Sequence, residues 1–149
     1  MSAAAGTRVV GREPELGAAL ARIACVDVIN ATMRFVDEKR ATDTLALYTD
    51  DAVMQFGDKE LDREALAESM RIRETDDVRR VHVPGQTDFW LEGPGKARAV
   101  TLLQLFNLGP DGSVVPPLQA ITRLEDELVR SADGIWRIAR RVVRPLAGA

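Results

Sequence analysis

Two side chains in this 149-residue sequence are suited to acid–base chemistry, His82 and Asp37. His82 is the only histidine, and imidazole is the side chain that titrates nearest to neutral pH. Asp37 ends an apolar helical stripe, where the helix dipole disfavours negative charge, so we expect it to need a protonatable partner. If His82 lies opposite, Asp37 accepts one ring N–H and fixes the tautomer. The other ring nitrogen is then a general base for a proton beside a substrate carbonyl.

Such a pair permits three reactions. Loss of a β-hydroxyl would give dehydration, reprotonation at another carbon would give isomerisation, and attack on an internal electrophile would give cyclisation. General-base assistance typically contributes about 10²–10⁴-fold. A purely structural interpretation stays open, in which Asp37 pairs with Lys39 or Arg40 and His82 is a satisfied strand residue.

Residue counts exclude other kinds of site. A single histidine excludes centres that need two imidazoles, among them most catalytic zinc sites. The glycines lack phosphate-loop spacing, and no cluster of Asp, Glu and His has metal-ligand spacing. We therefore predict no metal and no nucleotide cofactor. Cys25, in mid-helix, is predicted to be a small buried hydrophobe, and a single cysteine favours a reducing cytoplasm.

Length and composition predict one domain. The chain is 46% apolar, too high for a disordered protein, and its formal charge of −3 argues against a nucleic-acid partner. No apolar run approaches the roughly 20 residues that cross a bilayer, so no membrane partner is expected. Residues 1–14 are small and polar and are predicted to form a flexible arm before a single domain at 15–149.

The predicted helices come first and the long strands follow, the order of an α+β fold. Helical periodicity covers 15–39 and 42–48, and Asp62 is placed as the N-cap of a helix that ends near Thr75. A short strand at 52–56 returns through Glu60 and Leu61. Longer strands are predicted at 79–91, 96–108, 118–130 and 135–144, with a loop at 109–117 and an Asp133-Gly134 hairpin turn. They would form a curved antiparallel sheet with the helices on one face.

We make two predictions for the outer face of this sheet, one about association and one about ion pairs. The strand at 96–108 is apolar on both faces, with Val100, Leu102 and Phe106 opposite Ala99, Leu103 and Leu105, which favours a homodimer or higher homo-oligomer through the outer face. Late arginines lie across the hairpin from acidic residues, so we expect cross-strand ion pairs on a solvated or interface face. The residues concerned are Arg137, Arg140, Arg141, Arg144, Glu125, Asp126 and Glu127.

The order of these landmarks resembles the SnoaL-like group of the nuclear transport factor two-like superfamily over about residues 15–145. The landmarks are Phe35-Val36-Asp37, Leu47-Tyr48-Thr49-Asp50-Asp51-Ala52-Val53, Arg80-Val81-His82, Leu128-Val129-Arg130 and Asp133-Gly134-Ile135-Trp136-Arg137-Ile138-Ala139-Arg140-Arg141. The resemblance implies a cone-shaped α+β roll whose pocket lies between the concave sheet face and the helices. Members include scytalone and bile-acid dehydratases, polyketide cyclases and steroid isomerases.

The resemblance also assigns positions. Asp37 and His82 match the catalytic aspartate and histidine of the dehydratases, and Pro84-Gly85-Gln86-Thr87 is similar to scytalone dehydratase. The sequence departs from that pattern by lacking a second histidine and the two carbonyl-polarising phenols. No tyrosine is present near Thr32 and Met33, and Phe56 occupies the place of the other phenol. Asn30, Tyr48 and Thr101 are candidate substitutes for the missing electrophile.

These observations predict a cofactor-independent dehydratase, isomerase or cyclase that acts on a small hydrophobic carbonyl compound, with His82 as base and acid oriented by Asp37. The residues predicted to contact substrate are Asn30, Met33, Tyr48, Met54, Phe56, Trp90 and Thr101. The alternative is a non-catalytic protein of the same fold. It would bind a hydrophobic ligand or serve as an assembly subunit, as the similar small subunits of ring-hydroxylating dioxygenases do.

Overall fold

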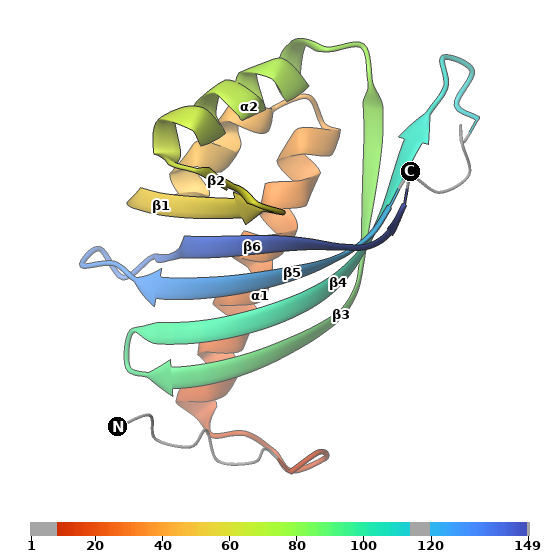
Figure 1. The fold of residues 1–149 in the computed structure, drawn as a ribbon. Coiled ribbons are helices and arrows are strands. Elements are labelled where there is room, and N and C mark those ends of the chain that lie inside the picture. The colour runs from red at the N-terminus through yellow and green to blue at the C-terminus, as the bar shows by residue number, and fades with distance from the viewer. Residues whose placement is uncertain (1–8, 114–119, 149) are drawn as a thin grey trace.

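The computed structural model of the protein describes residues 9–113 and 120–148. It has the predicted α+β cone fold, a strongly curved sheet with helices on its concave side (Figure 1). The elements in chain order are α1 (Leu16–Asp37), the 3-10 helix η1 (Ala41–Leu47), β1 (Tyr48–Phe56), β2 (Lys59–Leu61), α2 (Arg63–Thr75), β3 (Arg79–Gly93), β4 (Lys96–Leu108), β5 (Ala120–Arg130) and β6 (Trp136–Gly148).

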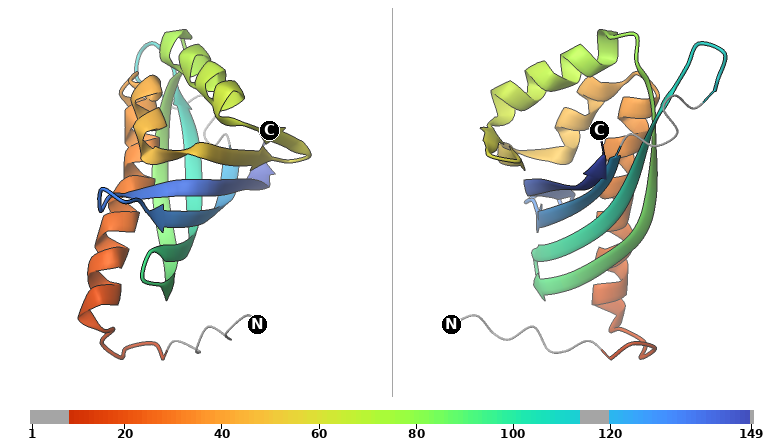
Figure 2. Two further views of the ribbon diagram at one scale, coloured as in Figure 1. Left: turned by 90° about the vertical axis from the view of Figure 1, so that its left-hand side faces the viewer. Right: turned by 45° about the vertical axis from the view of Figure 1, so that its right-hand side comes forward.

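The strands of the described residues form one six-stranded sheet, in the order β2-β1-β6-β5-β4-β3. Neighbouring strands pair antiparallel, except that β1 and β6 are parallel, so the sheet is mixed and not wholly antiparallel as predicted. A parallel pair needs a long crossover connection, and the whole segment from β2 to β5 provides it. The sheet bends so that α2 stands over its concave face while α1 crosses the strands (Figure 2).

The hydrophobic core lies between α1 and the sheet. α1 packs on β3, β6 and η1, and its inner face buries Cys25 and Ile29 completely. On the opposing strands Ala97, Leu128 and Ile138 are fully buried. α1 is long and apolar enough by length and composition to cross a membrane. One side of it packs against this core, as the core helix of a folded domain does.

Two elements differ most from the sequence prediction in their bounds. The segment from Tyr48 to Asp51 is the first part of β1 rather than a helix end, since Tyr48 pairs with Ile138 of β6. β6 continues past the predicted end at Arg144, through Pro145 to Gly148, and pairs with β5. The predicted arm is described only from residue 9, where 9–14 form no helix or strand, and the predicted loop only to residue 113.

Local interactions at two helix ends position the site. Asp62 caps α2 as predicted, accepting a hydrogen bond from the Ala65 N–H at 2.9 Å. After α1, Lys39 adopts a left-handed conformation with φ 60°, which usually favours glycine. Its ammonium compensates by donating to the Asp76 carboxylate at 2.8 Å and to the Arg73 and Asp76 carbonyls. The end of α1 is thereby fixed beside β3.

Candidate active site

The carboxylate of Asp37 binds His82 at two points. Its Oδ2 accepts the His82 backbone N–H at 2.8 Å, and its Oδ1 lies 2.5 Å from the ring Nδ1. β3 is an edge strand, so part of its backbone has no sheet partner, and Asp37 satisfies one such N–H. A carboxylate oxygen accepts the hydrogen bond here, so in the neutral imidazole this contact assigns the proton to Nδ1 and makes Nε2 the bare nitrogen.

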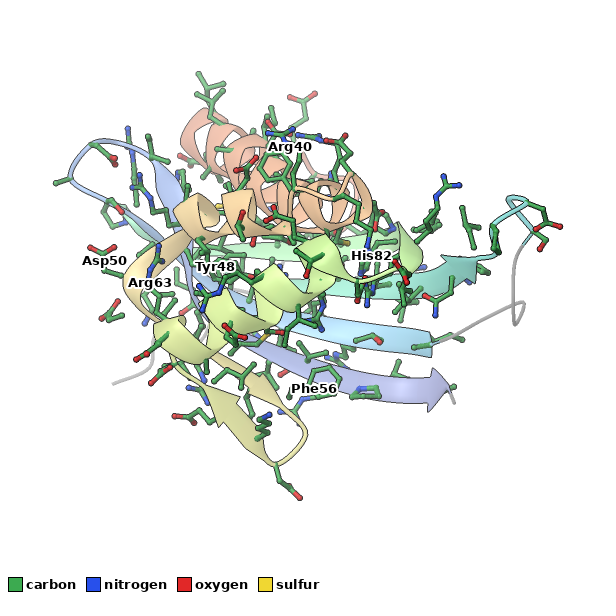
Figure 3. The ribbon with its side chains drawn as sticks, turned by 90° about the horizontal axis from the view of Figure 1, so that it is seen from above. Arg40, Tyr48, Asp50, Phe56, Arg63 and His82 are labelled. Atoms are coloured by element: carbon green, nitrogen blue, oxygen red, sulfur yellow. The ribbon has the colours of Figure 1, made fainter. Side chains whose placement is uncertain are left out.

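Strand register turns His82 toward the inside of the cone. His82 pairs with Leu105 of β4, and both side chains line a cavity of about 540 Å³ on the concave face. Nε2 makes no hydrogen bond to any residue in the described ranges. Seen from above, α2 lies across this region, with His82 and Phe56 on opposite sides of it (Figure 3). The predicted base therefore lies on the wall of a cavity that can hold a ligand.

Five of the predicted site residues line this cavity: His82, Met33, Tyr48, Met54 and Phe56. Asp37 contacts the cavity only through His82. The other three lie elsewhere, contrary to expectation. Asn30 borders a separate groove between α1 and β3. Trp90 stacks under Arg98 at 4.3 Å on the outer side, because strand alternation turns Phe89 inward. Thr101 is fully buried and its hydroxyl lies 3.2 Å from that of Thr87.

A buried ion pair at the cavity floor was not expected on this face. Arg141 and Asp126 are directly opposite on β6 and β5, with Nε–Oδ1 at 2.6 Å and Nη2–Oδ2 at 2.9 Å. The two side chains are 6% and 0% exposed. The prediction of a cross-strand pair was right, but its placement on a solvated or interface face was wrong for these two residues. Arg144 and Glu125, with 3.0 Å between them, form the expected exposed pair.

Arg141 also supports Tyr48. Its Nη1 donates to the Thr32 hydroxyl at 3.0 Å and to the Tyr48 hydroxyl at 3.4 Å. Burial raises the pKa of Tyr48, an effect that the Arg141 charge partly offsets. The phenol therefore stays protonated at neutral pH, and its O–H has no acceptor among the described residues. Of the three candidate electrophiles, only Tyr48 lines the cavity.

Positive charge gathers on the wall near His82. Arg80 forms a two-point ion pair with Asp76 at 3.0 and 2.6 Å, and Lys39 shares the same carboxylate. The hydrogen bonds from Arg80 and Lys39 hold the pKa of Asp76 well below its usual range. Arg73 of α2 lines the same cavity. Sequence reasoning missed it, although Leu66, Met70 and Arg73 follow a helical spacing that puts all three on one face.

Cys25 and the acidic groups suggest no other centre. Cys25 is completely buried, and burial raises the pKa of its thiol to about 12, which suits the predicted packing role. Within 9–113 and 120–148, no three or more His, Cys, Asp and Glu side chains gather as a metal site would require.

A family model supplies the match by sequence. Residues 17–142 match the model described as SnoaL-like domain. A search of curated proteins gives no significant match.

Solved structures show the same fold at low sequence identity. A protein from Novosphingobium aromaticivorans, provisionally described as a scytalone dehydratase, has a TM-score of 0.75 at 13% identity, with 88% of this chain and 87% of that chain covered. ActVI-ORFA from Streptomyces coelicolor has 0.74 at 17%, with 85% and 97% covered. The beta subunit of an aromatic-ring-hydroxylating dioxygenase, also provisionally described and from N. aromaticivorans, has 0.75 at 18%, with 89% and 93% covered. At such identities the likeness concerns the fold alone.

Proposed function

The chain belongs to the SnoaL-like domain family, and on that premise we propose that it is a cofactor-independent acid–base enzyme. It acts on a small hydrophobic carbonyl compound by dehydration, isomerisation or cyclisation. The observation that carries the proposal is the Asp37–His82 contact on the wall of a cavity, with Nε2 making no hydrogen bond to the part of the chain that the structure describes.

In this mechanism His82 Nε2 removes a proton from the carbon next to the substrate carbonyl. Asp37 keeps the proton of Nδ1 in place and stabilises the imidazolium that forms, because an opposite charge within hydrogen-bond distance favours the charged ring. His82 can then return the proton to a leaving hydroxyl or to another carbon. The apolar lining, which includes Met33, Met54 and Leu103, supports a hydrophobic substrate.

Tyr48 is the proposed electrophile. Proton removal places negative charge on the carbonyl oxygen, and a protonated phenol in a cavity is a suitable donor to it. The cation of Arg141 behind the phenol further stabilises that charge. Tyr48 thus takes the role for which dehydratases of the family use other tyrosines.

The test is hydrogen exchange on a carbon acid. With 2-tetralone in D₂O, proton NMR measures loss of the α-hydrogens, which needs only a base and a polarised carbonyl. The wild-type protein should accelerate this exchange, and His82→Gln should remove about 10²–10⁴-fold of the acceleration. Arg71→Gln on the exposed side of α2 is the matched control and should exchange like wild type. Equal rates for wild type and His82→Gln would refute the proposal.

A second candidate is non-catalytic binding of a hydrophobic ligand or service as an assembly subunit. It is favoured by the likeness to a dioxygenase beta subunit and by the apolar lining. In that case the cavity would bind apolar ligands, while wild type and His82→Gln would both leave 2-tetralone exchange at the buffer rate.

A further inference from the structure

The cavity contains one arginine that is held differently from the others. Among the described residues that line it, three are arginines, Arg73, Arg80 and Arg141, and none is Asp or Glu. Arg80 and Arg141 each make two-point ion pairs with carboxylates, Asp76 and Asp126 respectively. Arg73 makes no ion pair with any described residue. Its Nη1 donates to the side-chain hydroxyl and the carbonyl of Ser69, both neutral acceptors.

The unused part of Arg73 is the edge that best recognises a carboxylate. Nε and Nη2 donate to nothing in the described ranges, and these two N–H groups form the planar fork on one side of a guanidinium. Arg141 uses the same two atoms to hold both oxygens of Asp126.

The charges around Arg73 indicate that it binds an anionic group. Arg73 is half-buried, and burial together with the neighbouring Arg80 charge lowers the pKa of its guanidinium. The positive charge of Arg73 in turn lowers the pKa of Tyr48. Arg73 therefore lies close to both Arg80 and the proposed electrophile. One carboxylate, Asp76, already serves both Lys39 and Arg80, which leaves this wall with excess positive charge. An anionic ligand group would neutralise that charge.

We propose that the ligand of this cavity is a hydrophobic carboxylic acid whose carboxylate binds the Nε and Nη2 edge of Arg73. Resting on the proposed function, this assigns the substrate class as keto acids, with the carboxylate on Arg73 and the ketone toward Tyr48 and His82. Arg73 is a specificity-determining residue in this arrangement, and it takes no part in proton transfer.

A matched pair of probes tests this by isothermal titration calorimetry: 2-naphthoate, and 2-naphthamide of the same shape without the charge. Wild type should bind 2-naphthoate at least about tenfold more tightly than 2-naphthamide. Arg73→Gln should bring the ratio close to one, and Arg73→Lys should keep part of the preference. Arg71→Gln, two residues away and paired with Glu68 on the solvent side, should keep all of it.

His82→Gln separates this proposal from the proposed function. That variant should keep the preference for 2-naphthoate, since the carboxylate binds Arg73 and needs no base. If the wild-type protein fails to accelerate 2-tetralone exchange but still prefers 2-naphthoate, the proposed enzyme function is refuted and the assignment of Arg73 stands. Equal binding of the two probes by wild type, binding of neither, or a preference that survives Arg73→Gln would overturn the assignment of Arg73.

Discussion

His82 and Tyr48 divide the chemistry between a base and a proton donor. His82 lies on the edge strand β3 and depends on Asp37 for orientation, while Tyr48 begins β1 and depends on Arg141. β3 is one end of the strand order and β1 is next to the other end, so the two side chains line one cavity only because the sheet curves into a cone. His82 can therefore be substituted while Arg141 still supports Tyr48, and Tyr48 can be substituted while Asp37 still orients His82.

We predict that Tyr48→Phe slows the α-hydrogen exchange of 2-tetralone by about 10²-fold, the typical cost of losing one oxyanion donor. The ring stays, so packing of the cavity floor is preserved, and only the hydroxyl contact with Arg141 is lost. Binding of 2-naphthamide, measured by calorimetry, should change little. An exchange rate equal to that of wild type would remove Tyr48 from the mechanism.

At the scale of elements, the β5–β6 pair carries the cavity floor. Removing one partner of a buried ion pair leaves the other charge without compensation, which costs about 3–5 kcal/mol. We therefore expect Asp126→Leu and Arg141→Met each to lower the free energy of unfolding by that amount in urea titrations. The double variant Asp126→Leu/Arg141→Met should recover most of the loss. Additive losses in the double variant would contradict the coupling of the two charges.

The connection from α2 to β3 depends on Asp76 and gives a pH signature. Its hydrogen bonds to Arg80 and Lys39 depress its pKa in the folded state, so its stabilisation is fully present above the unfolded pKa near 3.8 and is lost as the pH falls through the lower folded value. Asp76→Asn should cost about 1–2 kcal/mol at neutral pH. The difference in free energy of unfolding between Asp76→Asn and wild type, measured by urea unfolding, should become smaller only below about pH 4.

A control for this effect is Asp58→Asn in the exposed turn between β1 and β2. It should leave stability unchanged across the same pH range. A cost of Asp76→Asn that stays constant down to about pH 2 would show that the ion pairs are not its cause.

For the whole molecule, we propose association through the outer face of the sheet. Val83 and Leu102 are 42% and 38% exposed there, on adjacent strands, while alternate residues such as Leu103 face the core. We predict that the wild-type protein is a dimer or larger by light scattering after size exclusion, and that Leu102→Glu shifts it toward monomer. Leu20→Glu, on an exposed apolar position of α1, should not. A monomeric wild type would contradict this.

The fold and the first pair of site residues could be predicted from the sequence because each has a local signal. Helical period, the Asp62 cap and the Asp133-Gly134 turn set the elements. An aspartate at the end of an apolar stripe made a contact with the only histidine one of two open interpretations, and the family resemblance assigned both positions. Tyr48 was expected to close a helix, yet its pairing with β6 makes it a strand residue. Pairing between segments ninety residues apart leaves no mark in the local sequence.

Arg141 shows a second limit. Strict alternation from Trp136 and Ile138 places Arg140 on the inner face. The register of β5 and β6 shifts by one residue at Ala139, however, and this bulge turns Arg141 inward instead. The one available signal was on the partner strand, where Asp126 occupies an inward position between Leu124 and Leu128. A carboxylate in such a position requires a buried cation, but the sequence does not say which arginine supplies it.

The most direct test of the central claim is the tautomer of His82, measured by nitrogen NMR on ¹⁵N-histidine-labelled protein without a histidine tag. With a single histidine, the imidazole signals need no further assignment. Because Asp37 accepts the Nδ1 proton, the neutral ring should show Nδ1 protonated and Nε2 as a bare nitrogen, and Nε2 should shift when 2-naphthoate enters the cavity. A neutral ring with its proton on Nε2, or an Nε2 signal indifferent to the ligand, would contradict a base held ready by Asp37.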